Sequence, residues 1–314
     1  MDSAGVFAII KAVGDESALR DSGREDLRRL SDLVKGSSDT TPVDTPRMWL
    51  QGLFVRIGQA VVAIGEEAYR TMDFSGRLMV ALGRIALHPR RLRLTPLFAV
   101  MEEAGINAVP IVMVMTFFIG AVIALVGANL LTTLGVSVFT VQLVGVAVLR
   151  EFGVVIAAIL LAGRSASAFA AQLGSMRMNQ EVDAMQVMGV DRFEALVVPR
   201  VLAALLMTPL LTFCADIGGM LGGMIVSWAM IDIDPTFFIQ RTLETVDIDH
   251  FWIGMSKAPF LALVISAAGC RHGLLVGGDT ESLGRHVTAA VVQSIFLIIM
   301  FDAIFALIFM VLDL

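Results

Sequence analysis

Five charged residues lie inside long apolar runs of the sequence, and they have the clearest potential for chemistry. Arg150 and Glu151 are adjacent in one run, Asp216 lies in a second, Lys257 in a third and Asp302 in a fourth. Each costs roughly 2.5–3.5 kcal/mol near the centre of a bilayer. Paired cations and anions could simply fix how the helices pack. We favour a polar patch that lines a cavity for a head group, because apolar side chains would pack helices at lower cost.

A polar stretch at residues 163–203 interrupts the apolar runs. It contains the arginines Arg164, Arg177, Arg192 and Arg200. Within it, residues 179–190 have the pattern of a short amphipathic helix. Because a helix this short gains most of its stability from packing, we expect it to dock against a partner protein.

The residues of this short helix have distinct expected places. Asn179 is the expected N-cap, and Glu181 and Asp183 lie in the first turn, where the helix dipole favours anions. Gly189 suits the C-terminal end of the helix. Val182, Met185 and Met188 follow one another at helical spacing and form a narrow apolar stripe.

The composition and the long apolar segments indicate that these residues lie in or between membrane-spanning helices. The chain has 314 residues, of which 57% are hydrophobic and 17% charged. Its mean hydropathy is +0.81, which is typical of a membrane protein. Five apolar segments are each long enough to cross a bilayer of about 30 Å. Their expected limits are 107–133, 140–163, 196–230, 251–270 and 287–312.

The charges of the connections predict an orientation. The connections at 164–195 and 271–286 are rich in arginine, whereas the connection at 231–250 is acidic. By the positive-inside rule the N-terminus and the 163–203 stretch are cytoplasmic. The acidic loop and the C-terminus are then on the outer side.

The first third of the chain differs from the rest. Residues 1–47 are expected to form an N-terminal cytoplasmic extension that ends in a Ser-, Thr- and Pro-rich linker. Residues 48–104 contain two amphipathic segments, 48–70 and 76–88, which suit a membrane–water interface. Residues 105–314 form the expected membrane domain.

Glycines in the third span predict close helix packing. Gly218, Gly219, Gly222 and Gly223 form two overlapping GxxxG patterns, which let another helix approach closely.

Several other functions find no support in the sequence. Its 23 basic and 29 acidic residues argue against a nucleic-acid-binding surface. We find no nucleophile–base pattern and no metal-ligand spacing, and the four histidines lie near expected span ends or connections. There is no GxxxxGK[ST] phosphate loop. If transport is driven by ATP, another chain must bind the ATP.

Four motifs in order resemble the MlaE-type permeases, which are membrane subunits of ABC lipid transporters. They are Leu149-Arg-Glu-Phe-Gly-Val154, Ala162-Gly-Arg164, Glu181-Val-Asp-Ala-Met-Gln-Val-Met-Gly189 and Val198-Pro-Arg-Val-Leu-Ala203. The resemblance covers about residues 76–314. Phe152 and Val154 stand where the family usually has Leu and Pro. Residues 5–35 are faintly similar to the tail of a STAS-like domain.

The resemblance implies an all-α polytopic membrane protein with an interfacial amphipathic helix, five transmembrane helices and a short cytoplasmic coupling helix. It implies a homodimer in the cell inner membrane that is not itself an enzyme and holds no cofactor, since ATP and Mg²⁺ belong to a partner ATPase. The other implied partners are an MCE-domain lipid-binding protein and a STAS-domain protein. The implied ATPase-coupling residues are Glu181, Asp183, Met185, Met188 and Gly189, and the implied lipid-cavity residues are Arg150, Glu151, Lys257 and Asp302, with Asp216 a weaker candidate.

Two other functional classes remain open from the residues. The first is an ion-coupled secondary transporter that uses Arg150, Glu151, Lys257 and Asp302 as a relay, although such carriers usually contain paired repeats. The second is a membrane enzyme that acts on lipids, for which no catalytic constellation is visible.

Overall fold

The computed structural model describes residues 49–88 and 94–312, and the regular structure in these ranges is entirely helical. Five helical segments within them are long and apolar enough to cross a membrane. They comprise Leu94–Thr133, Phe139–Met178, Phe193–Ile231, Ile248–Leu275 and Thr280–Val311. The predicted class, an all-α polytopic membrane protein, is confirmed. Each helical segment extends beyond at least one of its predicted limits, because the helices continue into polar residues at their ends.

The chain divides by its internal contacts into two units, Met1–Glu67 and Ala68–Leu314. The predicted extension at 1–47 lies outside the described residues. Helix α4, Trp49–Leu87, is continuous, so the expectation of two separate amphipathic segments is wrong. The residues expected to separate them continue the helix: Ser75 donates to the carbonyl oxygen of Thr71, and Arg77 pairs with Asp73 one turn earlier at 3.0 Å.

The membrane helices are built from shorter elements joined end to end. Helix α5 (Leu94–Ala104), the 3₁₀ turn η2 (Ile106–Ala108) and α6 (Val109–Thr133) form the first span. The second contains α7 (Phe139–Ala147), α8 (Gly153–Leu161) and α9 (Ser167–Met178). The third is α11 (Val198–Ile231), and α13 (Ile248–Leu275) and α14 (Thr280–Val311) are the last two.

Three π-helical turns interrupt these helices. They are η3 (Val148–Phe152), η4 (Ala162–Ala166) and η5 (Phe193–Val197). Turns η3 and η4 join the three helices of the second span, and η5 leads into α11. Such turns insert an extra residue into a helix and are frequent at functional sites. All three overlap or adjoin the sequence motifs described above.

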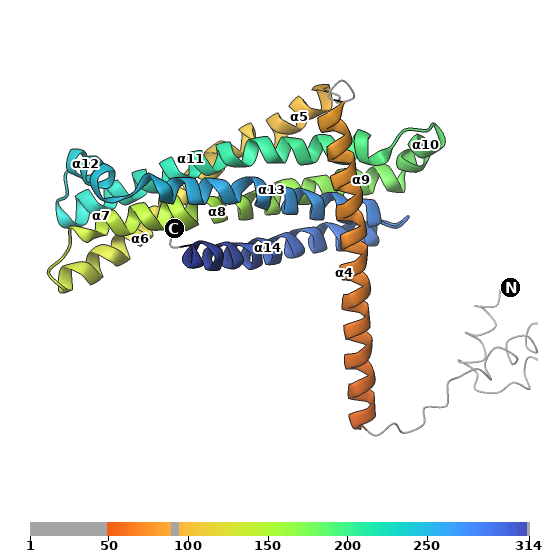
Figure 1. The fold of residues 1–314 in the computed structure, drawn as a ribbon, viewed down its shortest axis with the longest axis horizontal. Helices are drawn as coiled ribbons and strands as arrows, with labels where there is room; N and C mark the ends of the chain where they lie inside the picture. Colours follow the sequence, from red (N-terminus) through yellow and green to blue (C-terminus); the bar gives the residue numbers. More distant parts are fainter. Residues whose placement is uncertain (1–48, 89–93, 313–314) are drawn as a thin grey trace, which may run out of the picture. The chain divides into compact units, whose positions relative to one another are not determined.

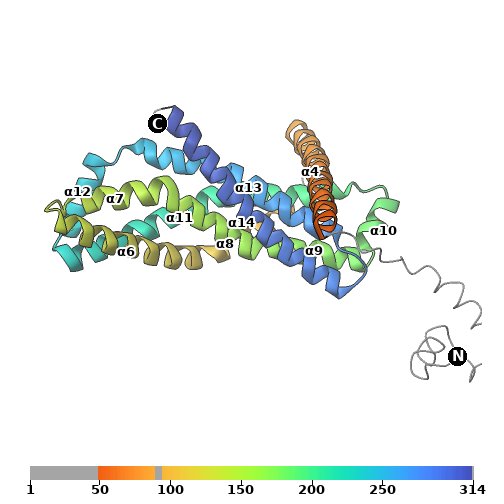
Figure 2. The same ribbon diagram turned by 90° about the horizontal axis from the view of Figure 1, so that it is seen from below.

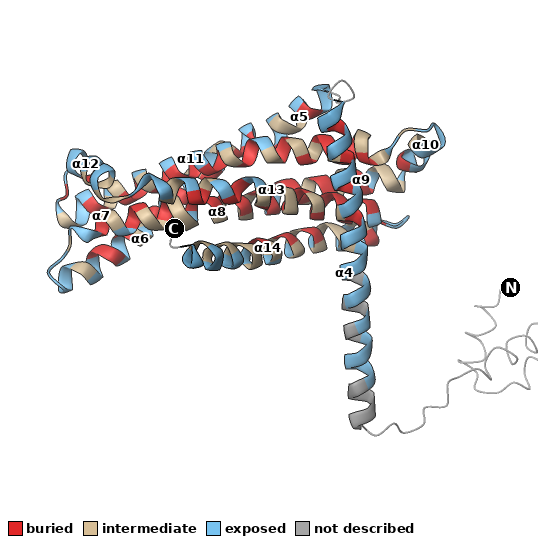
Figure 3. Ribbon diagram, in the orientation of Figure 1, coloured by how far each residue is buried: buried red, intermediate tan, exposed pale blue. Residues whose placement is uncertain are grey.

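Helix α11 is central to the second unit. It packs against α6 and α13, and α13 also packs against α9 and α14 (Figures 1 and 2). Two short helices lie at opposite ends of this bundle: α10 (Glu181–Val187) and α12 (Pro235–Thr245). Burial is concentrated on α8, α11 and α13, whereas α6 and α14 expose much of their surface (Figure 3). Exposed apolar surface on such helices suits contact with lipid tails.

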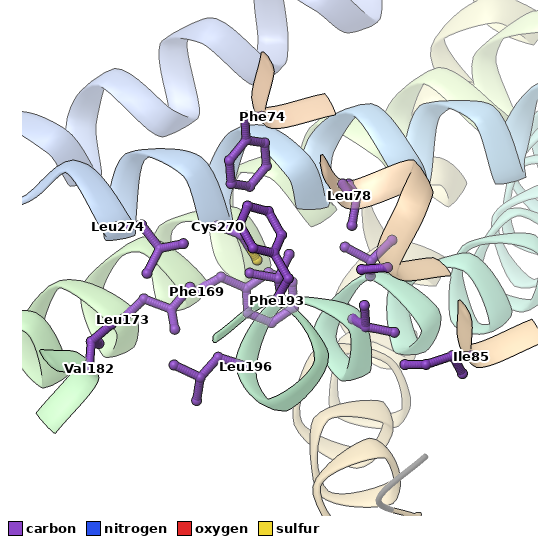
Figure 4. Packing of buried hydrophobic residues seen from close by; sticks show 14 of the residues in the cluster. Phe74, Leu78, Ile85, Phe169, Leu173, Val182, Phe193, Leu196, Cys270 and Leu274 are labelled. Atoms are coloured by element: carbon purple, nitrogen blue, oxygen red, sulfur yellow. The ribbon is translucent and has the colours of Figure 1, made fainter. Parts of the chain in front are cut away.

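A hydrophobic cluster at the α10 end connects the second unit's part of α4 to the bundle. Phe74 lies against Phe193, with ring centroids 5.3 Å apart (Figure 4). Leu78, Leu173 and Leu274 belong to the same buried cluster. The buried apolar side chains of this part of α4 therefore pack on the bundle, and the predicted place of the helix at the membrane interface stays a prediction.

The four glycines of α11 lie at its closest helix contacts. A methyl group at Gly222 would overlap the carbonyl oxygen of Phe117 in α6, and one at Gly218 would lie 2.6 Å from that of Met113. Gly219 and Gly223 face Val148 and Val144 of the second span instead. One pair of glycines thus faces α6 and the other pair faces the second span.

Helix α10 is shorter than predicted. Asn179 is the C-cap of α9 rather than an N-cap, so that expectation is wrong. The chain turns at Gln180, which has a φ of 60°, and α10 starts at Glu181 without a side-chain cap. The predicted end is confirmed: Gly189 has a φ of 77°, and the amide of Val190 donates to the carbonyl oxygen of Met185 at 2.9 Å, as in a Schellman motif.

Candidate functional site

Lys257 lies between two carboxylates from other helices. Its Nζ is 2.5 Å from Glu151 Oε2 and 3.0 Å from Asp302 Oδ1. The Lys257 side chain has no exposed surface, whereas the side chains of Glu151 and Asp302 are 33% and 22% exposed. The three charged residues predicted from separate apolar runs therefore meet at one place, which we call the Lys257 cluster.

Local packing explains why these three helices meet there. A methyl group at Gly254, one turn before Lys257, would overlap the carbonyl oxygen of Leu149, so α13 approaches the π turn η3 very closely. On the other side, the rings of Phe260 and Phe301 have centroids 4.8 Å apart and hold α13 against α14. Small and aromatic residues thus position the charges.

Arg150 extends the cluster toward His250. Its Nε is 3.7 Å from Glu151 Oε1, and one terminal nitrogen is 3.4 Å from His250 Nδ1. Arg150 and Glu151 both lie in η3, where the π turn changes the direction in which successive side chains leave the helix. The site therefore contains two cations, two carboxylates and an imidazole.

Asp216 is placed in a different environment. It is 3% exposed, and neither carboxylate oxygen has a hydrogen-bond partner among the described residues. It lies against Gly153, where a Cβ would overlap Asp216 Oδ1. Asp216 also lines an apolar cavity of about 330 Å³.

The walls of this cavity are almost entirely hydrophobic. They come from η3, α11, α12 and the start of α13 and include Leu149, Ile217, Phe238, Ile239 and Phe251. Leu149 and Phe251 are the immediate sequence neighbours of Arg150 and His250. An apolar cavity next to a charged cluster can accommodate an amphiphile, with its tail on the hydrophobic wall and its head near the charges.

Helix α10 exposes both charge and apolar surface. Glu181 and Asp183 are exposed, and Val187 and Met188 are 89% and 71% exposed at its C-terminal end. Met185 points the other way and packs against the buried cluster near α4. The sequence pattern did not identify Val187, which lies off the apolar stripe.

The two ends of the bundle differ in charge. Arg177 and Arg192 flank α10, whereas Asp232, Asp234 and Glu244 lie at or beside α12. At the acidic end, hydrogen bonds from the side chain and amide of Thr236 hold the pKa of Asp234 below its ordinary value. This carboxylate therefore caps α12 as an anion.

A histidine pair was missed by sequence reasoning. His272 is 7% exposed; its Nε2 is 2.6 Å from Gln293 Oε1, and its Nδ1 is 3.3 Å from His286 Nδ1. The sequence placed these histidines only near helix ends. The contact joins α13 to α14, and the spacing of the residues contained no signal for it.

Comparison with known protein families matches residues 97–308 to the family described as Permease MlaE. A "Probable ABC transporter permease protein" from Rickettsia prowazekii (strain Madrid E) is 32% identical over 195 residues, or 62% of this chain and 75% of the relative. One from Synechocystis is 31% identical over 62% of this chain and 74% of the relative.

The Arabidopsis thaliana protein TRIGALACTOSYLDIACYLGLYCEROL 1, chloroplastic, is 30% identical over 62% of this chain and 56% of its own length. The family match includes all of α6 to α13. Relatives of this kind indicate a transport role rather than catalysis, and an ABC permease works with an ATPase partner. The chain belongs to the MlaE permease family.

Proposed function

We propose that the chain is the permease subunit of an ABC transporter that moves phospholipid, or a related lipid, across or out of the cell inner membrane. ATP is hydrolysed by a separate subunit that holds ATP and Mg²⁺. Two copies of the permease form a homodimer, and MCE-domain proteins form the conduit for the lipid. A STAS-domain protein is a further partner that this proposal allows.

The observation that carries the proposal is the apolar cavity whose wall residues Leu149 and Phe251 adjoin Arg150 and His250 in the sequence. The cavity of about 330 Å³ is lined by aliphatic and aromatic side chains, with the Asp216 carboxylate buried in its wall. A hydrophilic solute would gain little from such walls, whereas acyl chains would be removed from water there. The name of the Arabidopsis relative contains that of a diacylglycerol lipid, which also favours lipid cargo.

Helix α10 is the proposed site of coupling to the ATPase. Helix α10 protrudes at one end of the bundle (Figure 1). Its first turn is acidic, and Val187 and Met188 at its C-terminal end are exposed. Met185 and the buried Val182 tie the helix to the bundle. Movement of the ATPase would then be transmitted through these anchors to α9 and α11.

A specific observation keeps an ion-coupled carrier as the second candidate. Lys257, Glu151 and Asp302 form a continuous chain of titratable groups across three helices. A proton relay would use such a chain. Membership of a permease family with ABC relatives favours ATP as the energy source over an ion gradient.

Reconstitution of the complex distinguishes these two energy sources. The tagged chain and its co-purifying ATPase are placed in proteoliposomes that contain a fluorescent phospholipid. We expect ATP to drive movement of the labelled lipid without any ion gradient, and a non-hydrolysable ATP analogue to abolish it. Movement that follows a proton or sodium gradient in the absence of ATP would overturn the proposal.

A further inference from the structure

A second pocket, separate from the apolar cavity, lies at the α10 end of the bundle and is rich in arginine. It has a volume of about 340 Å³. Five guanidinium groups line it: Arg70, Arg77, Arg177, Arg192 and Arg271. We call it the arginine pocket.

The arginines of this pocket come from distant parts of the second unit. Arg70 and Arg77 are on α4, Arg177 is in the last turn of α9, Arg192 precedes η5, and Arg271 is on α13. Arg271 is 3% exposed, so its side chain is almost completely buried. The convergence therefore depends on the tertiary fold.

The side chains that line the pocket are predominantly basic. Among the described residues, Asp73 is the only acidic one that lines it, and its carboxylate pairs with Arg77 at 3.0 Å, whereas Arg177 and Arg192 add two further cations. Cations brought together in a partly enclosed site repel one another, and an anion bound among them reduces this repulsion. The pocket thus has the electrostatic character of an anion site.

The remaining walls of the pocket are apolar and aromatic. Phe74 and Phe193 form one side, and Leu274 and Leu275 at the end of α13 form another. The Arg192 guanidinium lies over the Phe193 ring, 5.7 Å from its centroid. A pocket with cations and apolar walls at the end of membrane-spanning helices matches the boundary at which lipid phosphates lie.

We propose that the arginine pocket binds a phosphate group, carried either by an anionic phospholipid head group of the adjacent leaflet or by free phosphate. Forked guanidinium donors match phosphate oxygens in two-point hydrogen bonds. Bound phosphate would join α4, α9 and α13 at the same end of the bundle as α10. The proposal does not depend on what the transporter carries, since it concerns a different pocket.

The test uses the purified full-length chain in detergent and native mass spectrometry. Phosphatidylglycerol and phosphatidylcholine with identical acyl chains are titrated separately. The test variant is Arg177→Gln/Arg192→Gln, because these side chains are only partly buried. The matched control is Arg164→Gln/Arg285→Gln, which removes two exposed arginines that lie outside the pocket.

We expect the wild type and the control to prefer phosphatidylglycerol, and the test variant to lose this preference by about tenfold, as expected when a charged hydrogen bond to phosphate is removed. The Arg177→Lys/Arg192→Lys variant keeps both charges and should retain part of the preference. In a second arm, inorganic phosphate is compared with chloride for its effect on the melting temperature without added lipid.

The two arms separate the sources of the phosphate. A lipid preference lost only in the test variant assigns the pocket to a head group, and stabilisation by inorganic phosphate alone assigns it to free phosphate. Equal behaviour of the test and control variants in both arms would overturn the proposal. The proposal would also be overturned if the test variant no longer co-purified with the ATPase but kept both its preference for phosphatidylglycerol and its stabilisation by inorganic phosphate. The arginines would then bind acidic residues of the partner ATPase.

Discussion

Lys257 joins three helices through its ion pairs with two carboxylates, and substitutions at these residues can show what the ion pairs do. The ammonium group has no exposed surface, so both of its partners are needed to offset its desolvation. Glu151 and Asp302 keep some exposure and can reach solvent or a ligand. A purely structural role and a role in substrate handling predict different results when the charges are removed.

Replacing Lys257 by Met should destabilise the protein more than most single substitutions. The change leaves the carboxylates of Glu151 and Asp302 facing each other without the cation, and breaking such buried pairs costs about 3–5 kcal/mol. The expected result is a clearly lower melting temperature in detergent, measured by intrinsic fluorescence.

The neutral triple variant Lys257→Met/Glu151→Gln/Asp302→Asn is the matched control. It removes both cation and carboxylates, so we expect it to recover much of the lost stability and to lose ATP-driven lipid movement. Full transport in the triple variant would mean that the Lys257 cluster only stabilises helix packing.

Replacing Gly222 by Ala should disrupt the contact between α11 and α6. The added methyl group would overlap the backbone of Phe117, which cannot rotate away as a side chain could. Overpacking of this kind costs about 1–3 kcal/mol. Gly284→Ala on α14 is the control, since nothing lies within 4 Å of the added atom. Equal melting temperatures for the two variants would contradict the packing described here.

The sequence indicated that the charged residues pair with one another, but it did not indicate which residues pair or how the helices around them pack. The positions of Arg150, Glu151, Lys257 and Asp302 inside apolar runs of the sequence already indicated pairing, because unpaired charges in a membrane are costly. The pairing partners depend on how α13 approaches η3, which follows from Gly254 and the neighbouring backbone. Nothing in the periodicity of a single helix encodes that approach.

Among the elements, α10 is a case in which the sequence predicted the C-terminal end of a helix correctly and its N-terminal end wrongly. Gly189 was correctly expected to end the helix, because a left-handed residue at this position is usually glycine. Asn179 failed as an N-cap because α9 continues up to it and uses it as its own end. The π turns were not predicted at all, since one inserted residue leaves little trace in an apolar sequence.

Replacing Gly189 by Ala should loosen the end of α10 without creating a clash. Nothing lies within 4 Å of an added Cβ, so the effect comes from its φ of 77°, which costs an alanine about 1–2 kcal/mol. We expect faster amide hydrogen exchange at Gly189 and Val190. Gly163→Ala, also without neighbours within 4 Å, should leave this exchange unchanged, and equal exchange in both variants would contradict the prediction.

Reversing the charge of the first turn of α10 should weaken binding of the ATPase. In Glu181→Lys/Asp183→Lys, the exposed carboxylates become cations at the end of the bundle that is already rich in arginine. Because both side chains are exposed, we expect the fold to persist and ATPase co-purification to fall about tenfold, as loss of complementary charge across an interface does. The control is Glu244→Lys on α12, at the opposite end; a loss equal to that of the α10 variant would count against the coupling role of α10.

At the scale of the whole molecule, the arginines are unevenly distributed between the two ends of the bundle. Arg177 and Arg192 lie beside α10, and α12 has Asp232, Asp234 and Glu244 at or beside it; the cytoplasmic placement of α10 that was based on the arginines stays a prediction. The number of spans could be predicted from hydropathy alone. The apolar cavity could not, because its walls come from four elements that are distant in the sequence.

The most direct measurement of the central claim is lipid mass spectrometry on the purified complex, with the cavity either open or filled. Ile217→Trp places a large side chain in the cavity, and Ile299→Trp places one on the exposed face of α14 as a control. We predict that phospholipid co-purifies with the wild type and the control, and that much less is bound to Ile217→Trp. Equal amounts of lipid in all three samples, or none in the wild type, would contradict the account of this chain as a lipid permease.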